Sequence, residues 1–324
     1  MLHKRREELG KMTDCDRWIE ANIPDLTGRT AIVTGANSGL GLETARVLAR
    51  KGAHVVSAVR NLARGDVVAE RLRADAPGAS LSVMPLDLAS LESVHRFAEE
   101  FLAAHARLDI LVNNAGVMAI PHRKTADGFE MQFGTNHLGH FTLTGLLLPR
   151  ILATPGARVV TVSSGAHLLG KIHFDDLNSE RSYSKWGAYA QSKLANLLSA
   201  YELQRKLEAA GSSAFSVGAH PGYAATNLQL VGPAMEGSKW GQGVMLAANR
   251  VLAQSAAMGA LPEIYASTSP EVRGGDYIGP DGFLGQRGYP MKAESSRRSR
   301  DQGVAARLWT VSEQLTGVRY LRSP

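Results

Sequence analysis

Short apolar runs alternate along the chain with longer amphipathic stretches. The runs span Thr30–Thr34, His54–Val59, Leu81–Pro85, Asp109–Asn113, Arg158–Ser163 and Phe215–Ala219, and the stretches span Leu40–Lys51, Leu62–Asp75, Leu91–His105, Asn136–Ala153 and Trp186–Ala210. The runs are nearly continuous in apolar residues, as in strands that are buried on both faces. This alternation predicts an α/β fold with one doubly wound parallel sheet and helices on both of its faces.

The predicted elements fit one domain, which extends over residues 25–324 and follows an N-terminal extension over residues 1–24. Beyond about residue 257 the chain is richer in Gly and Pro, and the pattern assigns no elements there. Residues 1–12 are unlike domain sequence, so it stays open whether they belong to the native protein.

Composition narrows the class of protein. Of the 324 residues, 44% are hydrophobic and 20% are charged, which is typical of a globular protein with a substantial core. The single cysteine, Cys15, excludes an intrachain disulfide and fits a cytoplasmic location. No apolar run is long enough to predict a membrane span. The net charge of +6 comes without a DNA-binding motif, which favours a solvated surface over nucleic-acid binding.

A glycine-rich turn follows the first predicted strand and opens the first predicted helix. It comprises Gly35, Asn37, Ser38, Gly39, Leu40 and Gly41. Glycines permit a tight turn, and a helix N-terminus presents free N–H groups to a pyrophosphate. The G-x-x-x-G-x-G spacing therefore predicts a dinucleotide site in a Rossmann-type fold, although an ordinary strand–helix turn is the alternative.

The second predicted strand ends at Val59 and is followed by Arg60 and Asn61. In this kind of fold, that strand end lies beside the adenosine ribose of a dinucleotide. An acidic residue there would repel a 2′-phosphate, whereas a planar guanidinium suits one. Arg60 therefore predicts NADP as the cofactor, against the alternative of a surface arginine.

Three further strand ends carry candidate cofactor contacts. They are Asp87 and Leu88 after the third strand, Asn114, Ala115 and Gly116 after the fourth, and Pro221, Gly222 and Thr226 after the sixth. The Asp87 carboxylate either contacts the adenine amino group or caps the helix that starts near Ser90. For the other two groups, the formation of a turn alone is the alternative.

Tyr189 and Lys193 are spaced i and i+4, so they share one face of a predicted helix. A tyrosine hydroxyl has a pKa near 10, and an adjacent ammonium would lower that pKa by stabilising the phenolate. Such a pair is a tuned proton donor and acceptor. Many amphipathic helices contain this spacing, so its meaning comes from the order of the motifs: glycine turn, Asn-Asn-Ala-Gly, Ser163-Ser164, then Tyr189 and Lys193.

In this order, the motifs resemble those of the short-chain dehydrogenase/reductase family over about residues 28–230. The local sequence is most similar to the retinol-dehydrogenase-like branch at Val59–Asn61, Asn136–Phe141, Ser163–His167, Tyr189–Asn196 and His220–Thr226. The resemblance implies that Tyr189 transfers the proton and that Lys193 binds the nicotinamide ribose. It also implies that Ser164 orients the substrate oxygen and that Asn136 supports a water-linked proton relay to Lys193.

Ser163 is the alternative to Ser164, because 25 residues separate Ser164 from Tyr189, about twice the spacing of many family members. We prefer Ser164, because the last residue of a strand points into the cleft more readily than its neighbour. The pairs His137/His140 and His167/His173 invite a metal site, but no carboxylate completes a ligand set, and we expect no metal.

These features predict an NADP(H)-dependent oxidoreductase that interconverts a carbonyl and an alcohol on a small, apolar substrate. An apolar pocket lining is suggested by Met118, Leu168, Tyr223, Trp240 and Phe283, with core packing as the alternative. Retinol is not the default substrate, because the membrane anchor of many animal retinol dehydrogenases is missing. A non-catalytic NADP(H) sensor and a C=C reductase are the alternative functions, and a homo-oligomer stays open.

Overall fold

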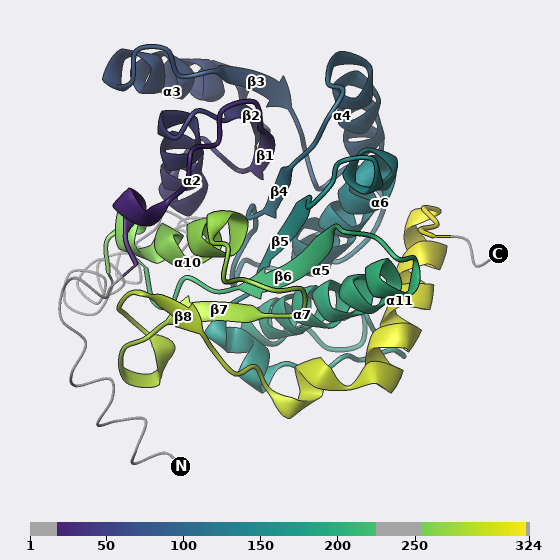
Figure 1. Cartoon of the computed structure of the whole chain (residues 1–324). Coiled ribbons are helices and arrows are strands. Elements are labelled where there is room, and N and C mark those ends of the chain that lie inside the picture. The colour runs from purple at the N-terminus through teal and green to yellow at the C-terminus, as the bar shows by residue number, and fades with distance from the viewer. Residues whose placement is uncertain (1–17, 225–253, 322–324) are drawn as a thin grey trace, which may run out of the picture.

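The computed structural model describes residues 18–224 and 254–321, and these form one sheet covered by helices on both faces (Figure 1). The strands are β1 (Thr30–Thr34), β2 (His54–Val59), β3 (Leu81–Pro85), β4 (Ile110–Asn113), β5 (Arg158–Val162), β6 (Phe215–Ala219), β7 (Tyr277–Pro280) and β8 (Pro290–Lys292). Their order across the sheet is β3-β2-β1-β4-β5-β6-β7-β8. Every pairing is parallel except β7 with β8, so the predicted doubly wound sheet is confirmed and gains an antiparallel edge.

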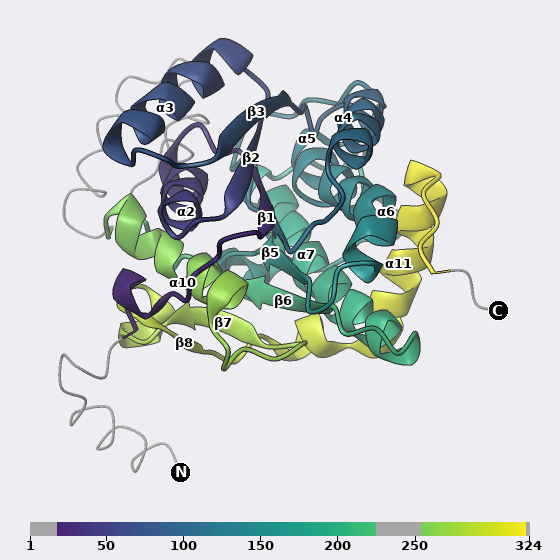
Figure 2. The same ribbon diagram turned by 45° about the horizontal axis from the view of Figure 1, so that its top comes forward.

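The helices lie in two layers. The longer ones are α2 (Gly39–Arg50), α3 (Leu62–Asp75), α4 (Leu91–Ala104), α6 (Gly139–Leu152), α7 (Lys185–Ala209), α10 (Ala256–Thr268) and α11 (Gln302–Thr316). Shorter segments are α5 (Met131–Phe133), η2 (Glu20–Asn22), η3 (Gly134–Leu138), η4 (Gly165–Leu169), η5 (Phe283–Gly285) and η6 (Arg297–Arg300). Helices α2, α3 and α10 cover one face, and α4, α6 and α7 cover the other (Figures 1 and 2).

The predicted strands agree with the observed ones to within one residue, because most of the runs are buried on both faces, although β3 at the edge of the sheet is only partly buried. Strand β1, for example, is buried at all five positions. The predicted helix over Asn136–Ala153 is longer and less regular than expected. It begins at Met131 and passes through a π-helical turn, η3, before α6.

The N-terminal residues of the described chain pack on the domain, although the boundary predicted at residue 25 stays a prediction. Trp18 meets the ring of Tyr265 edge-on at 5.0 Å, and Ile23 is buried in the core beneath α2. Glu20 forms ion pairs with Arg46 and Arg50 of α2.

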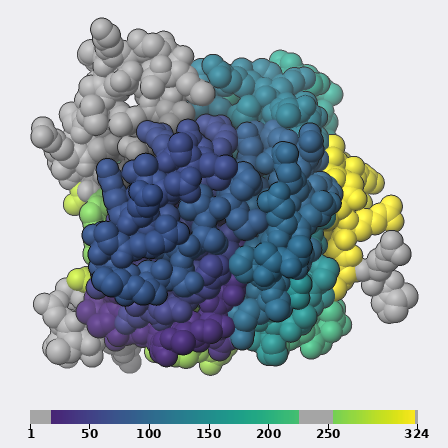
Figure 3. Space-filling model, turned by 90° about the horizontal axis from the view of Figure 1, so that it is seen from above, coloured from purple at the N-terminus to yellow at the C-terminus, as the bar shows by residue number. Residues whose placement is uncertain are grey.

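The C-terminal segment, for which the sequence pattern predicted no elements, closes the second helical layer. Helix α11 lies against α7, and the yellow C-terminal part of the chain lies at one edge of the molecule in Figures 1 and 3. The rings of Trp309 and Tyr320 meet edge-on with their centres 4.4 Å apart, and the Tyr320 hydroxyl donates to the Phe141 carbonyl at 2.5 Å. This contact fixes the end of the chain on α6 beside Gly145.

We expect Gly145→Ala to destabilise the fold by about 1–3 kcal/mol, because the added methyl overpacks a filled interface. A Cβ at Gly145 would lie 2.6 Å from Val318 Cγ1 and 2.7 Å from Tyr320 Cε2. Gly303→Ala is the matched control, since it adds the same methyl to an open position in α11, where helix propensity favours Ala by up to about 1 kcal/mol. Urea unfolding of both variants measures the difference, and equal stabilities would contradict the packing argument.

Candidate active site

The candidate site lies where the strand order reverses. The chain builds β1, β2 and β3 outward in one direction and then returns to place β4 on the other side of β1. At such a switch point the connections leave in opposite directions, so a crevice opens at the carboxyl ends of the strands, where α/β proteins bind nucleotides. All the predicted motifs within the described residues follow strands at this edge.

The glycine turn after β1 fits a dinucleotide phosphate. Gly35 and Gly39 adopt positive φ values of 71° and 57°, which favour glycine. A Cβ at Gly41 would lie 2.5 Å from Asn114 Nδ2 and 2.7 Å from the Gly35 carbonyl oxygen. Ser38 is the N-cap of α2, but its side chain makes no capping bond, which leaves the first amides of the helix to other acceptors.

The turn after β4 is tied directly to β1. Thr34 Oγ1 accepts hydrogen bonds from the amides of Asn114 and Ala115 at 2.9 and 3.0 Å, and Asn114 Nδ2 donates to the Thr34 carbonyl at 2.8 Å. Gly116 follows, and a Cβ there would lie 3.0 Å from Asn136 Oδ1 and 3.7 Å from Lys193 Nζ. The structure therefore places the glycine turn, the Asn114–Gly116 turn and Lys193 around one space.

Tyr189 and Lys193 are both buried on α7, with exposed fractions of 4% and 3%. Lys193 Nζ lies 5.8 Å from the centre of the Tyr189 ring and donates to the Val162 carbonyl at 3.1 Å, at the end of β5. The Ser164 side chain interacts with that of Tyr189 and lowers its pKa, and the Ser164 hydroxyl accepts the Ala166 amide at 3.2 Å. The Ser163 hydroxyl instead donates to the backbone carbonyl of Lys193 at 2.8 Å, so only Ser164 of the two serines faces the tyrosine.

Burial sets the proton affinities of this pair. It raises the pKa of Tyr189 to about 12, against a smaller lowering by the Ser164 hydrogen bond. It lowers the pKa of Lys193 to about 8, against a smaller rise caused by the charge of Glu263. The expected lowering of the tyrosine pKa by the lysine is not observed, because desolvation outweighs other effects in this enclosed site.

Three hydrogen bonds hold the Asn136 side chain inside η3. Its side-chain amide donates to the Val117 carbonyl and to Ser192 Oγ, both at 2.9 Å, and its oxygen accepts from the Val117 amide at 2.8 Å. The side chain therefore joins the loop after β4 to α7, one residue before Lys193. The π-helical turn is a feature that sequence periodicity could not reveal, although such turns are frequent at functional sites.

Helix α10 contributes a residue that the sequence analysis missed. Glu263 is 2% exposed, its Oε1 accepts a hydrogen bond from Thr44 of α2, and its Oε2 has no partner among the described residues. Burial raises its pKa to about 7, while the Thr44 bond and the charge of Lys193 lower it. The Gly- and Pro-rich composition of this part of the chain hid both the helix and its buried acid.

The adenosine end of the site is more open. Arg60 is exposed at the end of β2, beside Asn61, whose side chain caps α3 by accepting the Arg64 amide at 3.0 Å. Asp87 does not cap α4, because Ser90 does so. The Asp87 carboxylate accepts the Ala89 amide at 3.0 Å instead.

Four other predicted contacts have mixed outcomes. Leu88 is buried in the core, so only its backbone is available to a ligand. The Pro221 carbonyl accepts from Gln254 at 2.8 Å, and Gly222 turns the chain with a φ of 65°. Thr226 and Trp240 lie outside the described residues.

Of the predicted apolar lining residues, Leu168 and Phe283 are 58% and 79% exposed, which excludes core packing for these two. Within residues 18–224 and 254–321, no three His, Cys, Asp or Glu side chains gather as a metal cluster. In the same ranges no helix has the length and apolar character needed to cross a bilayer.

A comparison with protein families agrees with this geometry. A family model described as short chain dehydrogenase matches residues 29–231. The chain belongs to the short-chain dehydrogenase family. Among curated proteins, this short-chain dehydrogenase is 42% identical to human retinol dehydrogenase 14 over 313 residues, which covers 90% of the chain and 87% of the relative. The predicted family and its retinol-dehydrogenase-like branch are therefore confirmed.

Solved structures of similar proteins share the fold of this short-chain dehydrogenase. An uncharacterized protein from Mycobacterium paratuberculosis is 44% identical, with a TM-score of 0.78 over 94% of this chain and all of that one. A protein provisionally described as an NAD(P)-dependent gluconate 5-dehydrogenase from Beutenbergia cavernae, with bound NADP, is 27% identical. Its TM-score is 0.61, over 78% of this chain and 95% of that one.

We expect Glu263→Gln to stabilise this short-chain dehydrogenase at pH 8 but not at pH 4. Burial raises the folded-state pKa of Glu263 from its ordinary value of 4.5 to about 7, so the wild type loses stability as the pH rises from 4.5 to 7. The loss is on the order of 3 kcal/mol, since one pKa unit corresponds to about 1.4 kcal/mol. The neutral amide avoids this loss.

Urea unfolding at both pH values measures the effect, with the exposed Glu99→Gln as the control. Titration of Lys193 overlaps only the upper of the two pH values, because burial lowers its pKa from 10.5 to about 8. A stability difference between Glu263→Gln and the wild type that does not change with pH would contradict the burial of an ionisable carboxyl.

Proposed function

We propose that the protein is an NADP(H)-dependent oxidoreductase that interconverts a carbonyl and an alcohol on a small, apolar substrate. The observation that carries the proposal is the contact of Ser164 with buried Tyr189, beside Lys193, at the nucleotide-binding edge of the sheet. When bound, the nicotinamide would supply or accept the hydride. The protein side chains then have to bind the substrate oxygen and move one proton.

Each catalytic candidate has a role that suits its surroundings. Tyr189 is protonated at neutral pH, since its pKa is about 12, and it donates its proton to the substrate oxygen during reduction. Ser164 donates a hydrogen bond that orients the same oxygen. Lys193 is charged below a pH of about 8 and stabilises the phenolate left on Tyr189. Asn136 supports the path by which a proton returns to Lys193.

The cofactor proposal rests on Arg60 and the glycine turn. The amides at the start of α2 would hold the pyrophosphate, and the Asn114–Gly116 turn and Lys193 would hold the nicotinamide ribose. Arg60 is exposed and free to turn toward a 2′-phosphate. The NADP bound to the Beutenbergia cavernae protein supports this choice.

Two exposed apolar side chains near Ser164 and Tyr189 support an apolar substrate. Leu168 follows Ser164 by four residues, and Trp186 lies one helical turn before Tyr189, with its ring edge-on to the tyrosine at 6.3 Å. Both side chains are at least half exposed. The similar curated proteins are named for retinol, an apolar alcohol, which agrees with these side chains.

We expect Tyr189→Phe to lower kcat for carbonyl reduction by at least about 100-fold, because a general acid contributes roughly 10²–10⁴ to the rate. Affinity for NADPH, followed by its fluorescence, stays within about threefold, since the hydroxyl is the only group lost. Turnover is measured on a panel of aldehydes, ketones and enones with product analysis. Tyr183→Phe, which removes a hydroxyl bonded to the Ile120 carbonyl, is the matched control.

Undiminished turnover in Tyr189→Phe would refute the proposed proton donor. Tight NADPH binding by the wild type without any turnover would favour a cofactor sensor, and a saturated product from an enone would favour C=C reduction.

We expect Arg60→Asp to reverse the cofactor preference, with a loss of roughly 10–100-fold in kcat/KM for NADPH. A charge-assisted hydrogen bond to phosphate contributes about 1.5–3 kcal/mol. The value for NADH rises, because the carboxylate can accept hydrogen bonds from a 2′-hydroxyl. Arg71→Asp makes the same charge change at an exposed position of α3 and serves as the control. Parallel losses in both variants would show that general charge, rather than Arg60, sets the preference.

A further inference from the structure

His140 is a buried polar residue to which the proposed mechanism gives no role. It lies in the first turn of α6, is 3% exposed, and uses both ring nitrogens. Nε2 lies 2.9 Å from Thr34 Oγ1, and Nδ1 lies 3.0 Å from the backbone carbonyl oxygen of Asn136. The ring therefore spans from the end of β1 to η3.

The hydrogen-bond partners determine where each proton lies. The Asn136 carbonyl can only accept, so Nδ1 of His140 carries a proton and donates it. Burial lowers the pKa of His140 to about 4, so the ring is neutral and Nε2 is bare. The Thr34 hydroxyl then donates to Nε2 at 2.9 Å, in preference to the Val112 carbonyl at 3.3 Å.

The same Thr34 oxygen also fixes the turn after β4, since it accepts hydrogen bonds from the amides of Asn114 and Ala115. A directed chain of hydrogen bonds thus runs from these two amides through Thr34 and His140 to the Asn136 carbonyl. One end is the turn that would cradle the cofactor, and the other is the residue that would support the proton relay.

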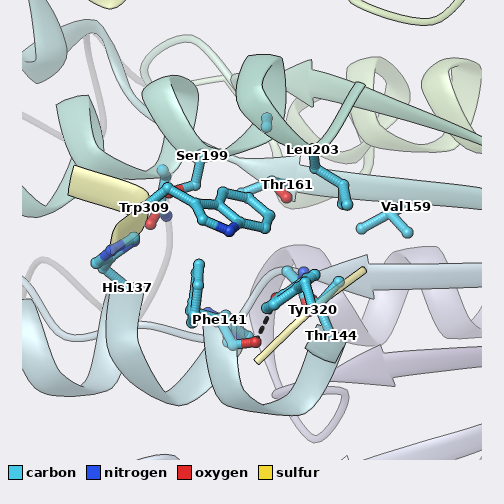
Figure 4. Close-up of a pocket in the computed structure, with 13 residues that line it drawn as sticks. His137, Phe141, Thr144, Val159, Thr161, Ser199, Leu203, Trp309 and Tyr320 are labelled. Carbon is cyan, nitrogen blue, oxygen red and sulfur yellow. Dashed lines mark hydrogen bonds between the residues drawn. The ribbon is translucent and has the colours of Figure 1, made fainter. Parts of the chain in front are cut away.

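A small cavity lies on the inner side of the histidine. It has a volume of about 30 Å³, and Figure 4 shows it between α6, α7 and α11, with His137 and Trp309 at its wall. Neither Tyr189 nor Ser164 lines it, so it lies behind the candidate active site. The cavity borders His140, and the two hydrogen bonds hold the imidazole in place.

We propose that His140 is a positioning residue, which uses its neutral imidazole, with the proton on Nδ1, to fix the cofactor-binding turn and the Asn136 carbonyl relative to each other. The roles given to the turn after β4 and to Asn136 rest on the proposed function, whereas the hydrogen bonds that link them do not. The groups that face the ring are the neutral His137, the ammonium of Lys193 and the polar partners already named.

The first test measures the proton position in the wild-type protein. In ¹⁵N-histidine-labelled protein without cofactor, the ring signals of His140 are assigned by their loss in His140→Gln. We expect a protonated Nδ1 and a bare Nε2 that do not change between about pH 5.5 and 8.5, since the pKa lies near 4. A proton on Nε2, or titration within this range, would overturn the proposal.

The second test separates positioning from stability. We expect His140→Leu, which keeps the bulk but loses both bonds, to weaken NADPH binding and to lower kcat by roughly 10-fold each, as for buried groups left unpaired. His140→Gln keeps one donor and one acceptor and recovers values within about threefold of the wild type. Thr142→Val is the control, since it removes a buried bond inside α6, to the Leu138 carbonyl.

The assays are run below the lowest melting temperature of the set. A purely structural role would lower the melting temperature of His140→Leu while its NADPH affinity matched that of Thr142→Val, and that outcome refutes positioning. Equal losses in His140→Leu and His140→Gln also refute it. If His140→Leu does not fold, the ring signals of the wild type and the NADPH affinity of His140→Gln decide.

Failure of the proposed function is recognisable separately. A wild type that turns over nothing on the carbonyl panel refutes that function, while the proton position and NADPH affinity still decide on His140. A wild type that turns over carbonyls but carries the His140 proton on Nε2 refutes only the positioning role.

Discussion

The reversal of strand order between β1 and β4 is the constraint on which the site depends. Parallel strands place all their carboxyl ends at one edge, and the reversal separates the connections there so that a ligand can enter. Residues from distant parts of the sequence, such as Gly35, Asn114 and Ser164, meet only because their strands end at this edge. The bonds from Asn114 and Ala115 to Thr34 then lock β1 to β4 at the crevice itself.

Three groups with altered proton affinities lie beneath this edge, and burial is the main cause for each. Tyr189 is harder to ionise, Lys193 is easier to deprotonate, and Glu263 holds its proton to nearly neutral pH. Buried ionisable groups such as Lys193 and Glu263 lower the stability of a fold, so the surrounding core has to offset that cost. The rigid sheet, with β1 fully buried, provides such a core. Altered pKa values of this kind are typical of sites that move protons.

The sequence predicted most of the central fold, because each buried strand is a continuous apolar run and the first helices have regular amphipathic spacing. It did not predict α10, β7, β8 or α11. These segments have Gly or Pro inside or beside them; Pro262, for example, lies within α10. It favoured Ser164 but kept Ser163 as the alternative, since a one-residue difference in direction depends on where β5 ends. The cytoplasmic location and any oligomer stay predictions.

The buried polar residues of α7 show why the Tyr189–Lys193 spacing acquired meaning only in three dimensions. Gln191, Ser192, Lys193 and Asn196 are all buried, so this stretch is no ordinary amphipathic helix with a polar face in water. Each has a fixed partner: a loop amide for Gln191, a backbone carbonyl for each of the others. Burying these four polar groups in one helix would be costly without such partners. The satisfied bonds therefore distinguish a helix that organises a site from one that only covers a sheet.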